Sequence, residues 1–226
     1  MRTRAILFDA LGTLLALEPP APRLCHELAE RYAVRITEAE ARLAMAAEIA
    51  FYRGHLDEGR DPDTLAALRE ACAAELRRAL PEAARHRLPP PGDLVETLLA
   101  SLRFDAYPDA KPALRACRSA GMRLVVVSNW DVSLHSVLGN VGLSPCLDAI
   151  LTAAEAGVRK PDPAIFVQAL RLADVSAAEA LHVGDSLDED VAGARAAGIE
   201  PVLVSRGGLD PPTGLRSVTT LAQLVA

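Results

Sequence analysis

Short runs of consecutive apolar residues alternate with helix-patterned segments along the second half of the chain. Four of these runs have the length and β-branched character of buried strands: residues 122–129, 148–153, 180–185 and 201–205. The segments beside them have the 3.6-residue apolar spacing of helices, at about 109–120, 132–140, 162–173 and 188–197. Gly198 is a candidate residue just past the end of the last helix. Strand–helix alternation of this kind predicts a parallel sheet with helices on both faces.

A different pattern lies between residues 16 and 104. Ala, Leu, Glu and Arg dominate there, and helical spacing is clear in EAEARLAMAAEIAFYRGHL and DTLAALREACAAELRRAL. Breaks near residues 59–62 and 88–92 divide the block into about four helices. Residues 4–9 precede it, yet they form a buried strand of the α/β type. We therefore predict a three-layer, Rossmann-like α/β core at residues 1–15 and 105–226, interrupted by a helical cap at residues 16–104.

Composition narrows the class of protein. Half of the 226 residues are hydrophobic and the net charge is −6, which favours a well-packed acidic protein over a nucleic-acid binder. The N-terminus lacks the pattern of a signal peptide, and no apolar stretch is long enough to span a membrane. The four cysteines are scattered, as expected for reduced thiols. We predict a cytoplasmic monomer or homodimer that binds a small anionic molecule, and neither nucleic acid nor a membrane.

Polar side chains follow the predicted strands where each strand ends. They are Asp9 after the first strand, Ser128 and Asn129 after the next, and Asp185 and Asp190 after residues 180–185. Lys160, one of only two lysines among 24 basic residues, lies in a loop that leads into a helix. Carboxyl ends of parallel strands meet at one edge of a sheet, where ligands bind. We therefore expect these side chains to lie close together.

Such a combination indicates magnesium and an anionic substrate. Neighbouring carboxylates repel one another, and Mg²⁺ removes the conflict because it prefers carboxylate oxygens, water and phosphate as ligands. Lys160 supplies a point charge for an anion, and Asp9 can act as a covalent nucleophile. Each residue alone has an ordinary structural role, such as a turn or a helix cap. Their order and their positions at strand ends favour a shared chemical role.

Four segments resemble the four sequence motifs of the haloacid dehalogenase-like (HAD) superfamily, in order along nearly the whole chain. They are AILFDALGTLL, VVVSNWD, GVRKPDPAIF and HVGDSLDEDVAGARAAG. The resemblance implies a hydrolase with a helical cap after the first motif and Asp9 as the nucleophile. It also implies that Ser128, Asn129 and Lys160 bind the substrate, with Lys160 counted as catalytic. The residues expected to bind Mg²⁺ are Asp9, the carbonyl of Leu11, Asp185 and Asp190.

One position departs from the family pattern. Phosphatases of the superfamily usually carry Asp two residues after the nucleophile, as general acid and base, and this chain has Leu11 there. Leu cannot transfer a proton, and a missing general acid typically costs about 10² to 10⁴ in rate. We consider Asp131 and His55 as substitute proton carriers, although a helix cap and a packing role are more typical of them. His182, inside a predicted strand, is expected to be a packed core residue.

Three interpretations of the function remain open. The first is a Mg²⁺-dependent phosphatase or phosphotransferase that acts on a small phosphorylated metabolite through an aspartyl-phosphate on Asp9, with a leaving group that needs little protonation. The second is a 2-haloacid dehalogenase, because the halide leaves without a proton; Asp185 and Asp190 argue against it, because unpaired carboxylates would repel a carboxylate substrate. The third is a catalytically weak or regulatory protein of the same fold.

Overall fold

A computed structural model describes residues 3–207 and 212–224 of the chain. Contacts divide the chain into two compact units, one formed by Met1–Ala16 with Asp105–Ala226 and the other by Leu17–Phe104. We call the first unit the core and the second the cap, and describe each by itself. The two chain segments that join them pair as a two-stranded sheet, β2 (Leu15–Leu17) with β3 (Phe104–Ala106).

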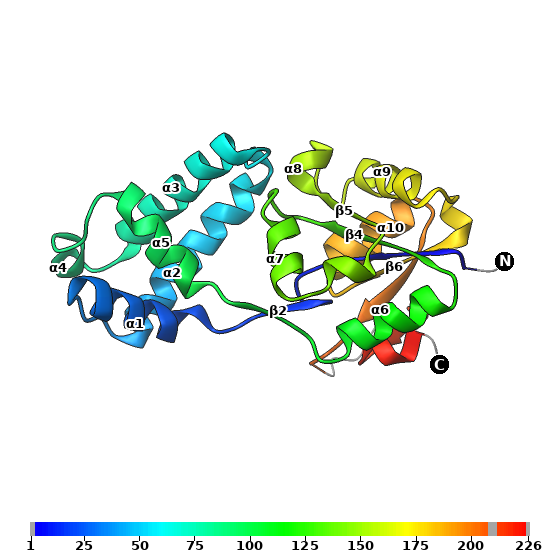
Figure 1. Cartoon of the computed structure of the whole chain (residues 1–226), viewed down its shortest axis with the longest axis horizontal. Coiled ribbons are helices and arrows are strands. Elements are labelled where there is room, and N and C mark those ends of the chain that lie inside the picture. Colours follow the sequence, from blue (N-terminus) through cyan, green and yellow to red (C-terminus); the bar gives the residue numbers. More distant parts are fainter. Residues whose placement is uncertain (1–2, 208–211, 225–226) are drawn as a thin grey trace. The chain divides into compact units, whose positions relative to one another are not determined.

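The core contains a six-stranded parallel sheet in the order β5-β4-β1-β6-β7-β8 (Figure 1). Its strands are β1 (Ala5–Phe8), β4 (Arg123–Ser128), β5 (Ala149–Thr152), β6 (Ala180–Gly184), β7 (Glu200–Val204) and β8 (Ser217–Val218). All four residues of β1 are at most 1% exposed, because this strand lies between β4 and β6 with helices above and below. The predicted parallel α/β sheet with an inserted helical cap is confirmed.

Helices cover both faces of the sheet, which gives the core its three layers. On one face, α9 (Pro163–Ala173) packs beside α10 (Ala192–Ala196), and on the other α6 (Ala110–Ser119) packs against the 3₁₀ turn η5 (Leu221–Leu224) (Figure 1). Further helical segments of the core are α7 (Leu134–Asn140), α8 (Ala153–Ala156) and the short 3₁₀ turns η2 (Ser144–Cys146) and η3 (Ala177–Glu179).

The last predicted helix differs in its first turn. It begins as a π-helical turn, η4 (Leu187–Val191), and continues as α10. Ser186 caps this turn, since its hydroxyl accepts a hydrogen bond from the amide of Glu189 at 3.1 Å. Gly198 follows α10 with a φ of +75°, as predicted for the residue past the helix end. Wide turns of this kind are rare and are frequently found at functional sites, and η4 carries the acidic residues Asp188, Glu189 and Asp190.

The cap is built from α1 (Pro20–Tyr32), α2 (Glu38–His55), α3 (Pro62–Ala79), the short α4 (Glu82–Arg85) and α5 (Pro91–Ser101), with a 3₁₀ turn, η1 (Leu56–Glu58), after α2. Capping boxes begin α2 at Thr37 and α3 at Asp61, and the second of them lies in the predicted break at residues 59–62. Apolar residues from α1, α2, α3 and α5 form one continuous hydrophobic core within the cap.

One carboxylate is buried inside this apolar interior. Glu48, on α2, is 3% exposed. Burial raises the pKa of Glu48 to about 7, and a hydrogen bond from the thiol of Cys72 only partly opposes the shift. Because the folded cap binds this proton more tightly than the unfolded chain does, Glu48 costs no stability at low pH. The cost grows as the pH rises from about 4.5 toward 7 and is complete above that.

We expect Glu48→Gln to stabilise the protein at pH 8 by up to about 3 kcal/mol, and to have little effect at pH 4.5. The reason is that Gln keeps the size of Glu but carries no charge to bury. Urea unfolding at both pH values measures the difference between variant and wild type. Glu30→Gln, an exposed position in α1, is the matched control. Equal stabilisation at both pH values would contradict a buried titrating carboxylate.

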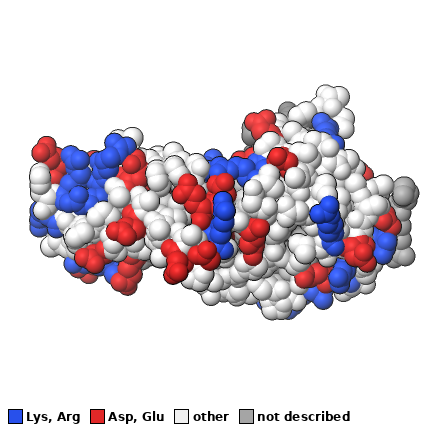
Figure 2. Space-filling model, turned by 90° about the horizontal axis from the view of Figure 1, so that it is seen from above, with Lys and Arg blue, Asp and Glu red and all other residues white. Residues whose placement is uncertain are grey.

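None of the helices within residues 3–207 and 212–224 combines the length and the apolar character that a bilayer span requires. On the face that Figure 2 shows, Lys and Arg side chains lie intermixed with Asp and Glu side chains.

Candidate active site

Three neighbouring strands bring the sequence-predicted acids and the serine to one edge of the core. Phe8, the last residue of β1, pairs with Val126 on β4 and with Val183 on β6. Asp9 therefore leaves β1 between the ends of β4, where Ser128 lies, and of β6, which Asp185 follows. The expectation that parallel strand ends would gather these side chains agrees with this geometry.

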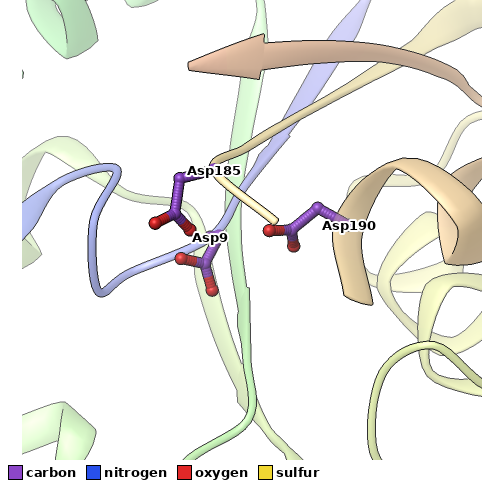
Figure 3. A group of neighbouring side chains, drawn as sticks. All are labelled: Asp9, Asp185 and Asp190. Atoms are coloured by element: carbon purple, nitrogen blue, oxygen red, sulfur yellow. The ribbon is translucent and has the colours of Figure 1, made fainter. Parts of the chain in front are cut away.

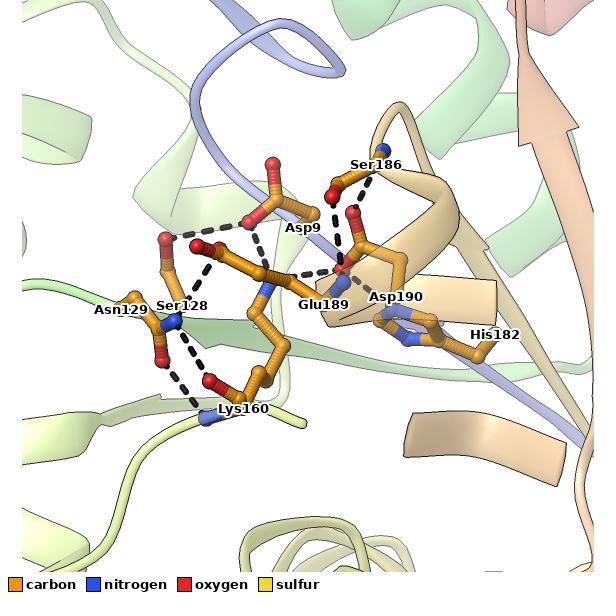
Figure 4. A network of polar contacts seen from close by, with 8 residues as sticks. All are labelled: Asp9, Ser128, Asn129, Lys160, His182, Ser186, Glu189 and Asp190. Atoms are coloured by element: carbon orange, nitrogen blue, oxygen red, sulfur yellow. Dashed lines mark hydrogen bonds and ion pairs between the residues drawn. The ribbon is translucent and has the colours of Figure 1, made fainter. Parts of the chain in front are cut away.

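Asp9 and Lys160 form the centre of the cluster (Figure 4). One carboxylate oxygen of Asp9, Oδ1, accepts hydrogen bonds from Lys160 Nζ at 2.6 Å and from the Ser128 hydroxyl at 3.2 Å. Both Asp9 and Lys160 are buried, at 6% and 2% exposed. An ion pair this well shielded holds the Asp9 side chain in one orientation and leaves its second oxygen, Oδ2, for another partner.

Asp190 is held from three sides. Its Oδ1 accepts hydrogen bonds from Lys160 Nζ at 2.6 Å and from His182 Nε2 at 2.9 Å, and its Oδ2 accepts one from the backbone amide of Ser186 at 3.0 Å. A side chain at residue 184 would collide with Asp190, since an added Cβ there would lie 2.2 Å from its Cγ, so this approach requires Gly184. Asp190 thus fixes Lys160 from the side opposite to Asp9.

Asp185 completes a group of three carboxylates (Figure 3). Oxygen atoms of Asp9, Asp185 and Asp190 all lie within 4.8 Å of one another. Unlike the other two, Asp185 is exposed. Gly12 has a φ of +86° and backs onto Asp185, because an added Cβ would meet its Oδ2 at 2.0 Å. The chain that follows Asp9 therefore bends back against the acid that follows β6.

The three carboxylates carry more negative charge than Lys160 can neutralise, which favours the binding of a dication. Burial raises the pKa of Asp9 to about 7; Lys160 opposes the shift, and Asp190 and Asp185 add to it. Burial would lower the pKa of Lys160, but Asp190 and Asp9 outweigh it and hold that pKa above its usual value. One ammonium cannot neutralise three carboxylates. The donor set, carboxylate oxygens with one exposed member, is the type that Mg²⁺ prefers, so the residues present can bind that ion.

The carbonyl of Leu11 was the fourth oxygen predicted for the metal. In the turn after Asp9, the Ala10 carbonyl accepts the amides of Leu14 and Leu15, and the Gly12 amide donates to Leu15. Among the described residues, none donates a hydrogen bond to the Leu11 carbonyl. This oxygen is therefore available to a ligand, whereas the Leu11 side chain offers no proton.

The Asn129 side chain supports Lys160, whereas the substrate contact that the family resemblance implies for Asn129 is one of its backbone. Its Oδ1 accepts the backbone amide of Lys160 at 2.7 Å, and its Nδ2 donates to the Lys160 carbonyl and to Glu189 Oε2, each at 3.0 Å. The Asn129 amide group thus fixes the backbone that carries Lys160. The predicted substrate contact of Ser128, Asn129 and Lys160 stays a prediction.

The two candidate proton carriers have structural partners. Asp131 is 4% exposed, and its Oδ1 accepts the amide of Ser133 at 2.7 Å, ahead of α7. His55 stacks on Phe51 within the cap, with ring centroids 4.1 Å apart, and its Nδ1 lies 2.7 Å from the Phe51 carbonyl oxygen. These contacts agree with the cap and packing roles that are typical of such residues.

Sequence reasoning missed two contacts that build the site. His182 is a fully buried core residue that packs edge-on against Phe166, as expected, but its Nε2 also bonds Asp190. Burial lowers the pKa of His182, and the bond to Asp190 opposes this shift. Because the Asp190 carboxylate can only accept, Nε2 is the donor in this bond. Glu189 bonds Asn129. The π-helical turn sets both distances, and an eight-residue spacing gave no signal for the His182–Asp190 pair.

This acid-and-lysine cluster, at the strand ends of a Rossmann-like core with an inserted helical cap, defines a hydrolase of the HAD fold. A model of the family described as haloacid dehalogenase-like hydrolase matches residues 3–198, which is most of the sequence. The chain therefore belongs to the haloacid dehalogenase-like hydrolases, and the resemblance inferred from the four motifs is confirmed.

The relatives match this chain over less than half of its length, whereas the solved structures match it over nearly all of its length. The haloacid dehalogenase-like hydrolase domain-containing protein 3 of Homo sapiens is 47% identical over 103 residues, which is 45% of this chain and 41% of that protein. The phosphoserine phosphatase of Thermus thermophilus is 37% identical over 107 residues, 46% of this chain and 43% of that protein. The chain thus spans less than half the length of these two relatives.

Among solved structures, the HAD phosphatase from Thermococcus onnurineus has a TM-score of 0.66 and 25% identity, with 98% of this chain and 96% of that chain covered. A dehalogenase has a TM-score of 0.67 and 26% identity, with 98% and 95% covered. The fold of this chain is thus about equally similar to a phosphatase and to a dehalogenase, so only the residues of the site can distinguish the two activities.

Proposed function

We propose that the protein is a Mg²⁺-dependent phosphatase that hydrolyses a small phosphorylated metabolite, with Asp9 as the nucleophile. The observation that carries this proposal is the triad of Asp9, Asp185 and Asp190, whose oxygens lie within 4.8 Å of one another beside Lys160. A dehalogenase needs no cation at that point, and three carboxylates without one would repel a carboxylate substrate. A cation site beside a nucleophile suits a phosphate.

We assign the residues of the site the following roles in phosphoryl transfer. Ser128, the backbone near Asn129 and Lys160 bind the phosphoryl oxygens, and a carboxylate oxygen of Asp9 attacks phosphorus as the bond to the leaving oxygen breaks. Water then attacks phosphorus, which releases inorganic phosphate and restores the Asp9 carboxylate. Asp9, Asp185 and the Leu11 carbonyl would hold Mg²⁺, with Asp190 as the supporting acid. The ion offsets the charge that gathers on the phosphoryl oxygens.

Leu11 restricts the leaving groups that the site can handle, because it cannot protonate them. The side chains within hydrogen-bond distance of Asp9 are Ser128 and Lys160 among the described residues, and Lys160 is locked between two carboxylates. An alkoxide would therefore leave without a proton from residue 11, at a cost of about 10² to 10⁴ in rate. We infer that good substrates carry a leaving group stable as an anion, such as an acyl or aryl phosphate.

One assay separates the candidate functions. We expect Mg²⁺-dependent phosphate release from acetyl phosphate and p-nitrophenyl phosphate, lost in EDTA and restored by added Mg²⁺. 2-Chloropropionate is the second substrate class, because halide also leaves without a proton and the chain resembles a solved dehalogenase. Chloride release that persists in EDTA would replace the phosphatase proposal with the dehalogenase one. Mg²⁺ binding without turnover of any of the three would indicate a regulatory protein.

A further inference from the structure

Arg206 lies outside the four motifs yet makes four hydrogen bonds next to the site. It follows β7 and is partly buried, with 19% of its side chain exposed. Its Nε donates to the Gly12 carbonyl at 3.3 Å and its Nη2 to the Thr13 carbonyl at 2.7 Å. The same guanidinium binds Asp109 with two bonds, at 3.1 and 3.0 Å. Arg206 therefore bridges the turn after the nucleophile to a distant part of the core.

The turn that Arg206 holds is the one that carries the predicted metal oxygen. Gly12 and Thr13 are the first two residues after Leu11, and the next carbonyl, that of Leu14, accepts the Tyr107 amide at 3.0 Å. The carbonyls of residues 12, 13 and 14 are thus each fixed from outside the turn, whereas the Leu11 carbonyl accepts no hydrogen bond from the described part of the chain. Gly12 also backs onto Asp185, so any shift of the turn changes the space around that carboxylate.

Asp109, the second partner of Arg206, is itself held by hydrogen bonds. Asp109 accepts hydrogen bonds from the Thr220 hydroxyl at 2.7 Å and the Leu221 amide at 2.8 Å, as well as from Arg206. Burial alone would raise the pKa of Asp109, but Arg206, Thr220 and Leu221 outweigh it and hold that pKa below its usual value, so the carboxylate is charged. The Arg206 guanidinium also lies 3.7 Å from the centroid of the Tyr107 ring.

We propose that Arg206, anchored by Asp109, is a positioning residue for the metal site, which sets the backbone of residues 11–13 so that the Leu11 carbonyl faces the cation with Asp9 and Asp185. This inference rests on the proposed function. The planar fork of Arg reaches two carbonyls and a carboxylate at once, whereas Lys presents a single ammonium and cannot. A purely structural ion pair between Arg206 and Asp109 would not need the two bonds to Gly12 and Thr13.

The test is the Mg²⁺ affinity of Arg206→Lys, measured by titration calorimetry on the full chain well below its melting temperature. We expect the dissociation constant to rise by about 10- to 100-fold, as for other groups that orient metal ligands. The rate of p-nitrophenyl phosphate hydrolysis should fall in parallel at a Mg²⁺ concentration near the wild-type dissociation constant, and saturating Mg²⁺ should restore most of it. Arg216→Lys is the control, because Arg216 is an exposed arginine that pairs with Glu200 at 3.9 Å and, among the described residues, has no hydrogen bond or ion pair with residues 11–13.

A second variant covers the case in which Arg206→Lys does not fold. Asp109→Asn keeps the shape of the anchor and removes its charge, and we expect a smaller loss of Mg²⁺ affinity from it. A folded variant of either kind whose Mg²⁺ affinity stays within twofold of wild type would overturn the proposal, whatever happens to its melting temperature. The calorimetric result stands apart from the phosphatase proposal, because a wild-type protein that binds Mg²⁺ without releasing phosphate would contradict only the latter.

Discussion

Asp9→Asn is expected to lower kcat for acetyl phosphate by about 10⁴-fold or more, because the amide cannot attack phosphorus and the covalent step is lost. Asn has the shape of Asp and can still accept a hydrogen bond from Lys160 or Ser128 at the position of Oδ1. The fold should therefore remain. Initial rates with saturating Mg²⁺ measure the effect, and circular dichroism checks the fold.

A direct sign of the nucleophile is the covalent intermediate. Acetyl phosphate is labelled in its phosphoryl group, and the reaction is quenched with acid during turnover. The wild-type protein should then carry the label, and Asp9→Asn should carry none. Asp63→Asn, an exposed residue in the first turn of α3, is the control and should be labelled like wild type. A folded Asp9→Asn variant that keeps more than a tenth of the wild-type rate would exclude Asp9 as the attacking group.

Leu11→Asp is expected to raise the turnover of alkyl phosphates such as glycerol phosphate by about 10²-fold or more. The introduced carboxyl group can protonate the leaving alkoxide and then activate water, the two tasks that Leu cannot perform. Turnover of p-nitrophenyl phosphate should change little, since nitrophenolate leaves without a proton. The informative quantity is thus the ratio of the two rates in each protein.

Leu11→Asn is the matched control for that experiment. Asn has nearly the volume of Asp and the same polarity of the turn, but it transfers no proton at neutral pH. A gain with Asn equal to that with Asp would show that polarity at residue 11, and not proton transfer, limits the reaction. No gain from a folded Leu11→Asp protein would mean that the leaving group is activated elsewhere.

Sequence patterns predicted the parts of this molecule that depend on local chemistry. Strands β1, β4 and β6 are mostly apolar runs, and a polar residue lies at the end of each run or directly after it. That rule brought Asp9, Ser128 and Asp185 to one edge. Helices α2 and α3 could be predicted equally well, because their apolar residues recur every three or four positions.

The rest depends on side chains that meet only after folding. Strands β2, β3 and β8 have two or three residues each, too few for any periodicity to register. The bond between His182 and Asp190 depends on the π-helical turn between them, and Arg206 reaches Gly12 across 194 positions of sequence. Single-sequence reasoning has no measure of such distances, so it found the acids, Ser128 and Lys160 but missed the contacts of His182, Glu189 and Arg206.

The central place of β1 has a consequence for how the chain folds as it is synthesised. Ala5 pairs with Arg123, 118 positions later, and Phe8 pairs with Val183, 175 positions later. β1 therefore leaves the ribosome before its sheet neighbours, and its four apolar residues have none until the 118 positions from Ala5 to Arg123 have been made. Contacts this distant in sequence form slowly, while the α-helical hairpins of the cap can form from near neighbours in the meantime. The interval before β4 emerges is thus when the nascent chain is most exposed to aggregation.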